Sequence, residues 1–256
     1  MGSNENKTSP DYSRFAGQYA RSRPTYPPEL FAHLASLVDR HRLAWDCATG
    51  NGQAAVELVN YFDRVIATDV SAEQIKHATR HPNIEYRVAA SEASGLDDCS
   101  VDLVTVASAM HWFDLGRFYS EARRVAVPGG VLAAWSYHVG RVEPPFDRIF
   151  DRFYREAVSS FFSPGARLVD DRYETVTLPG EPLDEVRFHV SASWNLDQLL
   201  DFIRSWSGTR RYILERGEDP VALIADKLEA VWGRREAVHL VRWPLYMKIS
   251  RLSRAV

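Results

Sequence analysis

The chain has 256 residues, of which 45% are hydrophobic and 25% are charged, so it is long enough to bury a substantial core. Its formal net charge of −3 supplies no positive field for a phosphate backbone, and we therefore expect no nucleic-acid partner. Cys47 and Cys99 are the two cysteines, and the eight histidines lack paired ligand spacing, so neither a disulfide framework nor a metal site is expected.

The amino-terminal residues 1–10 are polar and contain no apolar stretch. A secretory signal needs an apolar segment of about seven residues or more, and a membrane-spanning helix needs about 20, so we expect neither. Cysteines without a pairing pattern suit a reducing compartment. The sequence therefore predicts a cytoplasmic protein without a membrane partner.

Short apolar runs alternate with longer amphipathic stretches from Leu43 onward, a pattern typical of strands that are covered by helices on both faces. The apolar runs predict five strands, at Leu43–Cys47, Arg64–Asp69, Ile84–Ala89, Val101–Ala107 and Val131–Tyr137. The amphipathic stretches predict helices at Gln53–Phe62, Ala72–Thr79 and Leu115–Val125, the last of which is stopped by Pro128-Gly129-Gly130. Right-handed crossovers then give a doubly wound α/β sheet of parallel strands, with ligands at their carboxyl ends.

The regular alternation of short apolar runs and amphipathic stretches ends after Tyr137. One long amphipathic helix is predicted over Pro145–Phe162, followed by a strand, two helices and a last strand at Val186–Trp194, Leu196–Ser205, Val221–Trp232 and Leu245–Leu252. We therefore expect a mostly parallel, seven-stranded sheet with a helical cap inserted after the fifth strand. No internal repeat or long linker divides the chain, so residues 1–256 are predicted to form one domain.

The segment from Asp46 to Gln53, which reads D-C-A-T-G-N-G-Q, joins the first predicted strand to the first helix. A glycine-rich turn in this place lets a ligand approach bare backbone. A dinucleotide fingerprint prefers a third glycine three residues after the second, and Ala55 stands there. The carboxylate of Asp46 would repel a pyrophosphate and attract the ammonium group of an amino-acid ligand. The segment therefore favours a ligand with an amino-acid part over a nicotinamide dinucleotide.

Asp69 closes the second predicted strand, one strand–helix–strand step after Asp46. A carboxylate in this place can accept hydrogen bonds from two ribose hydroxyls. Taken singly, an acidic residue at a strand end is more often a helix cap or a turn residue. Together with Asp46, Gly50 and Gly52, Asp69 predicts a nucleoside site that the first two strand ends share.

These residues resemble the class I S-adenosylmethionine-dependent methyltransferases, in particular the small-molecule branch that includes trans-aconitate methyltransferase-like and ubiquinone-biosynthesis-like enzymes. The resemblance covers nearly the whole chain, and its motifs are matched by Tyr12–Pro28, Asp46–Gln53, Val65–Ser71, Val101–Phe113 and Glu121–Gly130. It implies S-adenosylmethionine as cofactor and a small-molecule acceptor. It also implies four parts, which are an N-terminal helical lid (1–42), a cofactor-binding core (43–140), a cap with the sixth strand (141–236) and the last strand (237–256).

The resemblance further implies which residues hold the cofactor. Its methionine part is expected at Tyr19, Arg23, Asp46, Ala48, Gly50, Gly52 and Gln53. Its ribose and adenine are expected at Asp69, Val70, Gln74, Ser91 and Glu92, and further contacts are expected at Ser108 and His111. Gln74 is equally well explained as a solvated helix residue, and Tyr19 and Arg23 as a packed N-terminal segment.

Two positions depart from the family pattern. Ala48 stands where a glycine is usual, and we expect a backbone outside the left-handed region to accept its methyl group. Ala90 stands where the family often has an aspartate that meets the adenine amino group. Adenine is therefore expected to rely on backbone groups, Ser91 and apolar stacking.

The acceptor is expected beyond the ends of the fourth and fifth strands. His111 and Tyr137 are the candidate catalytic residues, because each follows or closes one of these strands. Trp112, Tyr137 and Trp206 are candidate walls of the acceptor pocket, although Trp112 and a lone histidine are each also explained by a structural role.

The chemical class of the acceptor stays open at the level of sequence. A carboxylate would require a cationic clamp, for which Arg141, Arg204 and Arg210 are candidates. A hydroxyl or carbon acceptor would need proton removal, to which His111, Tyr137 or His138 can contribute.

The sequence thus predicts an S-adenosylmethionine-dependent methyltransferase that acts on oxygen or carbon of a small molecule, with a carboxylate, a quinone-like compound or a lipid metabolite as acceptor. Two alternatives remain, an NAD-dependent oxidoreductase with a degenerate fingerprint and a non-catalytic cofactor-binding member. The residues do not indicate an oligomeric state.

Overall fold

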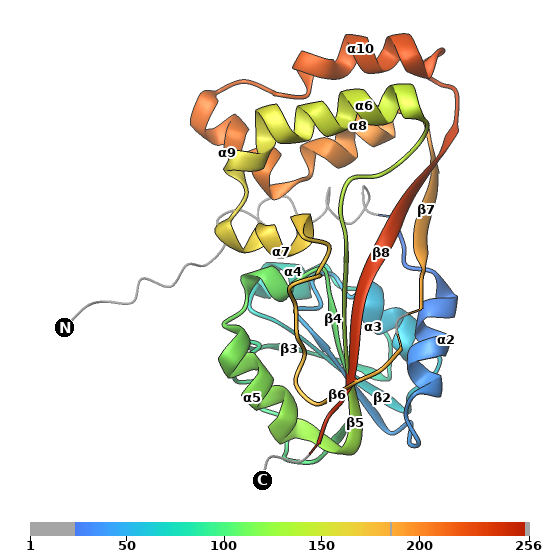
Figure 1. Ribbon diagram of the computed structural model, residues 1–256. Helices are drawn as coiled ribbons and strands as arrows, with labels where there is room; N and C mark the ends of the chain where they lie inside the picture. Colours follow the sequence, from blue (N-terminus) through green and yellow to red (C-terminus); the bar gives the residue numbers. More distant parts are fainter. Residues whose placement is uncertain (1–23, 185, 254–256) are drawn as a thin grey trace, which may run out of the picture.

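The computed structural model describes residues 24–184 and 186–253. In this part of the chain one sheet of eight strands has the order β3-β2-β1-β4-β5-β8-β6, with β7 paired to β8 beside this path (Figure 1). The strands are β1 (Leu43–Cys47), β2 (Arg64–Asp69), β3 (Ile84–Val88), β4 (Val101–Ala107), β5 (Ala126–Tyr137), β6 (Glu181–Pro182), β7 (His189–Trp194) and β8 (His239–Arg251). The predicted doubly wound, mostly parallel α/β sheet is confirmed, with the two-residue β6 as one strand more than expected.

The first five strands are parallel, and β8 runs antiparallel to β5, β6 and β7. Strand β1 lies between β2 and β4, so Asp46 is opposite Ala67 on one side and Thr105 on the other. The central strands β1 and β4 are almost completely buried, which explains why they read as continuous apolar runs. This register brings the carboxyl ends of β1, β2 and β4 to one edge of the sheet.

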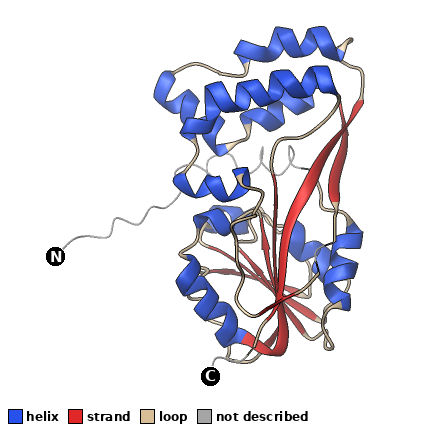
Figure 2. Cartoon of the chain, in the orientation of Figure 1, coloured by secondary structure: helices blue, strands red, loops and turns tan. Residues whose placement is uncertain are grey.

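Helices cover both faces of the sheet (Figure 2). They are α2 (Pro28–Ser36), α3 (Gln53–Leu58), α4 (Ala72–Lys76) and α5 (Leu115–Val125), with a 3-10 turn η2 at Met110–Trp112. Leu30, Phe31 and Leu34 of α2 belong to the core on one face, whereas Phe118 and Ala122 of α5 belong to the core on the other. Helices α3 and α4 end earlier than predicted, because short i→i+3 hydrogen bonds close their last turns.

A helical cap follows β5, as expected. It contains α6 (Pro144–Phe153), the π-helical turn η3 (Tyr154–Val158), the 3-10 turns η4 (Ser159–Phe161) and η5 (Pro164–Ala166), and α7 (Arg167–Asp170), α8 (Leu196–Arg204), α9 (Ser207–Arg216) and α10 (Ala222–Trp232). The single helix predicted over Pro145–Phe162 is wrong beyond Phe153, where the π turn shifts the helical register.

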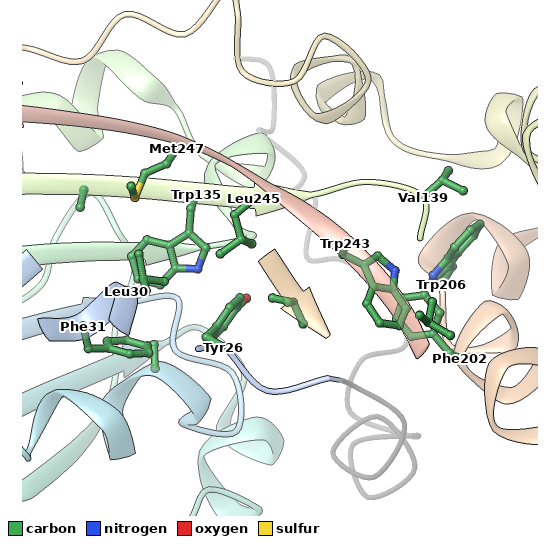
Figure 3. Close-up of a cluster of buried hydrophobic side chains, with 14 of the residues drawn as sticks. Tyr26, Leu30, Phe31, Trp135, Val139, Phe202, Trp206, Trp243, Leu245 and Met247 are labelled. Carbon is green, nitrogen blue, oxygen red and sulfur yellow. The ribbon is translucent and has the colours of Figure 1, made fainter. Parts of the chain in front are cut away.

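Ring contacts connect the cap to the sheet (Figure 3). Centroid distances are 5.7 Å between Trp206 and Phe202, 5.3 Å between Phe202 and Trp243, 6.3 Å between Trp243 and Tyr137, and 6.4 Å between Tyr137 and Tyr26. All five residues belong to or pack against one apolar cluster. Strand β8 runs through this cluster from the sheet to the cap, so the position of the cap over the strand ends is fixed by shared core packing.

Candidate active site

Asp46 lies at the carboxyl end of β1 and has no exposed surface. Its carboxylate accepts hydrogen bonds from Thr49 Oγ1 at 2.5 Å and from Thr105 Oγ1 at 2.9 Å. Burial raises the pKa of Asp46 to about 6, the two hydroxyls oppose this change, and the nearby charge of Asp69 adds to it. A cation beside this carboxylate would favour its ionised form, because opposite charges lower the pKa of an acid.

The turn after β1 uses the left-handed backbone region three times. The φ angle is +57° at Gly50, +86° at Gly52 and +56° at Ala48. The expectation that Ala48 lies outside the left-handed region is therefore wrong. This conformation costs an alanine about 1–2 kcal/mol, and the backbone hydrogen bond from Thr49 N to Thr68 O, at 2.9 Å, holds the turn against β2.

Asp69 closes β2 and ties the same turn to the second strand. Its Oδ2 accepts a hydrogen bond from Gly50 N at 2.9 Å, and its Oδ1 accepts one from Ser71 N at 2.8 Å. Burial raises the pKa of Asp69, while these two backbone donors lower it. Each oxygen of an ionised carboxylate has a further lone pair, so Asp69 can still accept hydrogen bonds from a diol.

Three acidic side chains lie close enough to the buried thiol of Cys47 to affect its pKa. Burial raises the pKa of this thiol, and the charges of Asp46, Glu92 and Asp69 raise it further. The carboxylates of Asp46, Asp69 and Glu92 thus act on the same thiol, although they come from β1, from β2 and from the segment after β3. The two aspartates that the sequence pattern joins in one nucleoside site lie at the same edge of the sheet.

The residues expected near adenine follow Asp69 and β3. Val70 is 67% exposed and offers apolar surface beside Asp69. Gln74 is 4% exposed, so it is not a solvated helix residue, and its Oε1 has no hydrogen-bond partner within the described part of the chain. Ser91 is buried, and Glu92 Oε1 accepts a hydrogen bond from Asp114 N at 3.1 Å.

The remaining cofactor candidates fall in three places. Tyr19 and Arg23 lie outside the described residues. Gln53 is the first residue of α3 and is half-buried. Ser108 follows β4 with a φ angle of +54°, and its Oγ is 3.3 Å from Tyr26 Oη.

A cavity of ≈ 100 Å³ lies where the carboxyl ends of β4 and β5 meet the cap. Its lining consists of three serines, two histidines, two tyrosines and five apolar or aromatic residues. Within the described residues, the lining contains no aspartate, glutamate, lysine or arginine. The lining brings together His111, Tyr137 and Trp206. Trp112 does not line this cavity and is 40% exposed, with its ring 4.8 Å from that of His111.

The chain is similar to known methyltransferases in both sequence and structure. A family profile described as "Methyltransferase domain" matches residues 45–134, which include Asp46, the turn and Asp69. A Dictyostelium discoideum protein described as a methyltransferase is 32% identical over 248 residues, which cover 94% of each chain. A solved structure from Anaeromyxobacter dehalogenans, described as a type II methyltransferase, is 39% identical with a TM-score of 0.83, and the match covers 90% of this chain and 99% of that one. The chain belongs to the class I S-adenosylmethionine-dependent methyltransferases.

The strand ends of this methyltransferase fit its cofactor, S-adenosylmethionine, in chemical terms. The ligand carries an ammonium group, a ribose diol and an adenine. The edge of the sheet offers a buried carboxylate at Asp46, a second carboxylate with open lone pairs at Asp69, apolar surface at Val70 and a buried amide oxygen without a partner at Gln74. An unpartnered buried oxygen is costly unless a donor reaches it, which a bound ligand can provide.

Several residues in and near the cavity of this methyltransferase were not singled out by the sequence pattern. Phe162 and Tyr154 line it, and Asp170 holds His138, another lining residue. His138 itself directly follows the end of β5 and was named from the sequence as a possible proton acceptor. Tyr154 and Asp170 carry no such signal, because a π turn and a four-residue helix place them.

The described part of the methyltransferase, residues 24–184 and 186–253, contains neither a metal cluster nor a membrane-spanning helix. In this part, no group of three or more histidine, cysteine, aspartate or glutamate side chains is arranged to hold a metal ion. The helices of the same part are too short or too polar to cross a membrane.

Proposed function

We propose that this methyltransferase holds S-adenosylmethionine along the carboxyl edge of β1 and β2 and methylates oxygen or carbon of an uncharged small molecule in the cavity under the cap. Asp46 binds the ammonium group, the backbone at Gly50 and Gly52 lies along the methionine part, Asp69 binds the ribose hydroxyls and Val70 covers one face of adenine. This placement is supported by the position of Asp46 and Asp69 at one edge of the sheet, where the charge of Asp69 raises the pKa of Asp46.

Among the described residues, the cavity lining contains no aspartate, glutamate, lysine or arginine, and this observation carries the choice of acceptor. A carboxylate acceptor needs a cationic partner, because burying an unpaired charge is unfavourable. Arg141 is paired with Asp151 at 2.8 Å, and Arg204 is paired with Asp219 at 2.8 Å. Neither these arginines nor Arg210 lines the cavity. A neutral acceptor is therefore favoured over the carboxylate that a trans-aconitate-like enzyme would take.

The volume of the cavity indicates which of the two ligands it can hold. A pocket for a drug-sized ligand has about 300–1,000 Å³, whereas this cavity has ≈ 100 Å³. It therefore fits the reacting part of an acceptor, while the larger cofactor follows the strand edge. S-adenosylmethionine supplies a methyl group on a sulfonium, and transfer is an in-line displacement. Tyr137 and Trp206 then act by holding the acceptor in line and by excluding water.

Binding and turnover test this proposal separately. Calorimetry should show micromolar binding of S-adenosylhomocysteine, equivalent to about −8 kcal/mol, and no detectable binding of NAD. A screen with a labelled methyl donor should then compare phenols and enols with carboxylic acids and amines of similar size. We expect phenols or enols to be methylated and carboxylic acids to react at least tenfold more slowly. Preferential methylation of carboxylic acids contradicts the neutral acceptor, and binding without turnover of any class indicates a non-catalytic member.

A further inference from the structure

Three segments that are distant in sequence bring His138, Asp170 and Tyr154 together. His138 follows β5, Tyr154 opens the π turn η3, and Asp170 ends α7. Asp170 Oδ1 lies 2.9 Å from His138 Nε2 and accepts a hydrogen bond from Tyr154 Oη at 2.5 Å. The His138 and Tyr154 rings meet edge to face with their centroids 4.5 Å apart. The histidine is therefore held from two sides.

The hydrogen bonds decide which nitrogen of His138 carries the proton. Burial alone would raise the pKa of Asp170, but His138 and Tyr154 outweigh it and lower this pKa, so the carboxylate is ionised and accepts only. Burial first, and then Asp170, raise the pKa of Tyr154, so its hydroxyl stays protonated. His138 Nε2 must therefore donate to Asp170. In the neutral imidazole this leaves the lone pair on Nδ1, for which the described residues show no hydrogen bond.

The cluster lies at the cavity assigned to the acceptor. His138 and Tyr154 line it together with Ser108 and Ser136 from the strand ends, whereas Asp170 does not line it. His138 is 22% exposed in its side chain, so it is held in place and still reachable. Among residues 24–184 and 186–253, the titratable groups that contact His138 or share its cavity are Asp170, Tyr154, His111 and Tyr137. Asp170 is the one acidic group among them.

We propose that His138 is the general base of this methyltransferase and takes the proton of a hydroxyl group on the acceptor, with Asp170 as a positioning residue. This inference rests on the proposed function, because it needs a hydroxyl acceptor in the cavity. An oxygen lone pair forms the new O–C bond, the C–S bond of the sulfonium breaks, and its electron pair stays on sulfur. The hydroxyl proton moves to Nδ1 of His138, so S-adenosylhomocysteine, a methyl ether and an imidazolium result.

A series of phenols of graded acidity tests the role of His138. General-base catalysis typically contributes about 10²–10⁴-fold to a rate. At pH 8, His138→Gln should lose about this factor with phenols whose hydroxyl pKa is near 10. Measured against wild type with the same acceptor, it should lose less than about threefold with nitrophenols that are already ionised in solution, because they need no base even though the anions enter an uncharged cavity more slowly. His77→Gln is the matched control, since His77 also pairs with a carboxylate, Glu73, at 3.0 Å but lies outside the cavity.

Asp170→Asn tests the positioning role through the split between kcat and KM. The neutral amide is a weaker acceptor for His138 Nε2 than the ionised carboxylate, so kcat with phenols whose hydroxyl pKa is near 10 should fall while KM for the acceptor changes less than kcat. Nitrogen NMR of the wild-type protein, assigned with His138→Gln, should show the proton on Nε2 of neutral His138. Calorimetry with S-adenosylhomocysteine should give the same affinity for all variants within about twofold, which separates loss of the base from loss of folding or of cofactor binding.

The outcomes distinguish the two proposals. A wild type that methylates phenols, with His138→Gln equally impaired on all phenols or unimpaired, overturns the role of His138 and leaves the proposed function standing. A wild type that methylates neither phenols nor enols overturns both. A proton found on Nδ1 of neutral His138 overturns the inference without reference to turnover.

Discussion

The buried carboxylate of Asp46 should make the stability of the ligand-free protein depend on pH. Burial raises its pKa from 3.8 to about 6. A tenfold change in an acid dissociation constant corresponds to about 1.4 kcal/mol, so this rise in pKa costs the native state about 3 kcal/mol once the group is ionised. Between pH 4 and pH 6 the native state binds more protons than the unfolded state. The contribution of Asp46 to the free energy of unfolding therefore falls as pH rises through this window.

Asp46→Asn removes this ionisation and keeps the shape of the side chain. The hydroxyls of Thr49 and Thr105 can donate to the amide oxygen or accept from the amide nitrogen, so the hydrogen bonds can be retained. We expect the difference in the free energy of unfolding, variant minus wild type, to be about 2.4 kcal/mol larger at pH 8 than at pH 4, because the unfolded aspartate is already partly ionised at pH 4. The variant should also bind S-adenosylhomocysteine at least tenfold more weakly at pH 8, because the ammonium group loses its carboxylate.

Urea denaturation of both proteins at pH 4, 5, 6 and 8 without ligand measures the first effect, and calorimetry measures the second. Asp97→Asn, which changes an exposed aspartate in the segment before β4, controls for the loss of one negative charge. A stability difference that is the same at pH 4 and pH 8 refutes the argument from burial. Unchanged affinity for S-adenosylhomocysteine refutes the assignment of Asp46 to the ammonium group.

Ala48→Gly should raise the free energy of unfolding in urea by about 0.5–1 kcal/mol, because glycine accepts φ = +56° without strain, and a less stable variant would contradict this. Gly165→Ala places a Cβ 2.0 Å from a backbone oxygen of η2 and should lower the free energy of unfolding by about 1–3 kcal/mol in the same assay. Gly116→Ala is the control, because its Cβ would have its nearest neighbour at 3.6 Å, and it should not lower the free energy of unfolding. Trp206→Ala should lower acceptor turnover far more than S-adenosylhomocysteine affinity in paired rate and calorimetric measurements. Trp232→Ala, an equally buried cap residue outside the cavity, should spare turnover of the folded enzyme, and equal losses in the two variants would argue against Trp206 as a pocket wall.

Much of the sheet could be predicted because its central strands are buried on both faces. The predicted bounds of β1, β2 and β4 agree with the structure, since each is a continuous apolar run. Strand β8 begins at His239, before the predicted Leu245, because its first half alternates between buried and exposed residues and contains Pro244. The cap was harder to predict, because the π turn after Phe153 and the weakly amphipathic α9 depend on aromatic packing between helices.

The sequence by itself determined that Asp46, the glycine turn and Asp69 meet at one edge of the sheet, because they lie within one strand–helix–strand unit whose geometry is local. Tertiary structure decided the features that depend on contacts between segments distant in sequence. The left-handed backbone at Ala48 and the raised pKa of Asp46 arise from the neighbouring strands that hold and bury the turn. His138 and Asp170 meet because the packed cap places a short helix beside the end of β5, and no spacing along the chain encodes that contact.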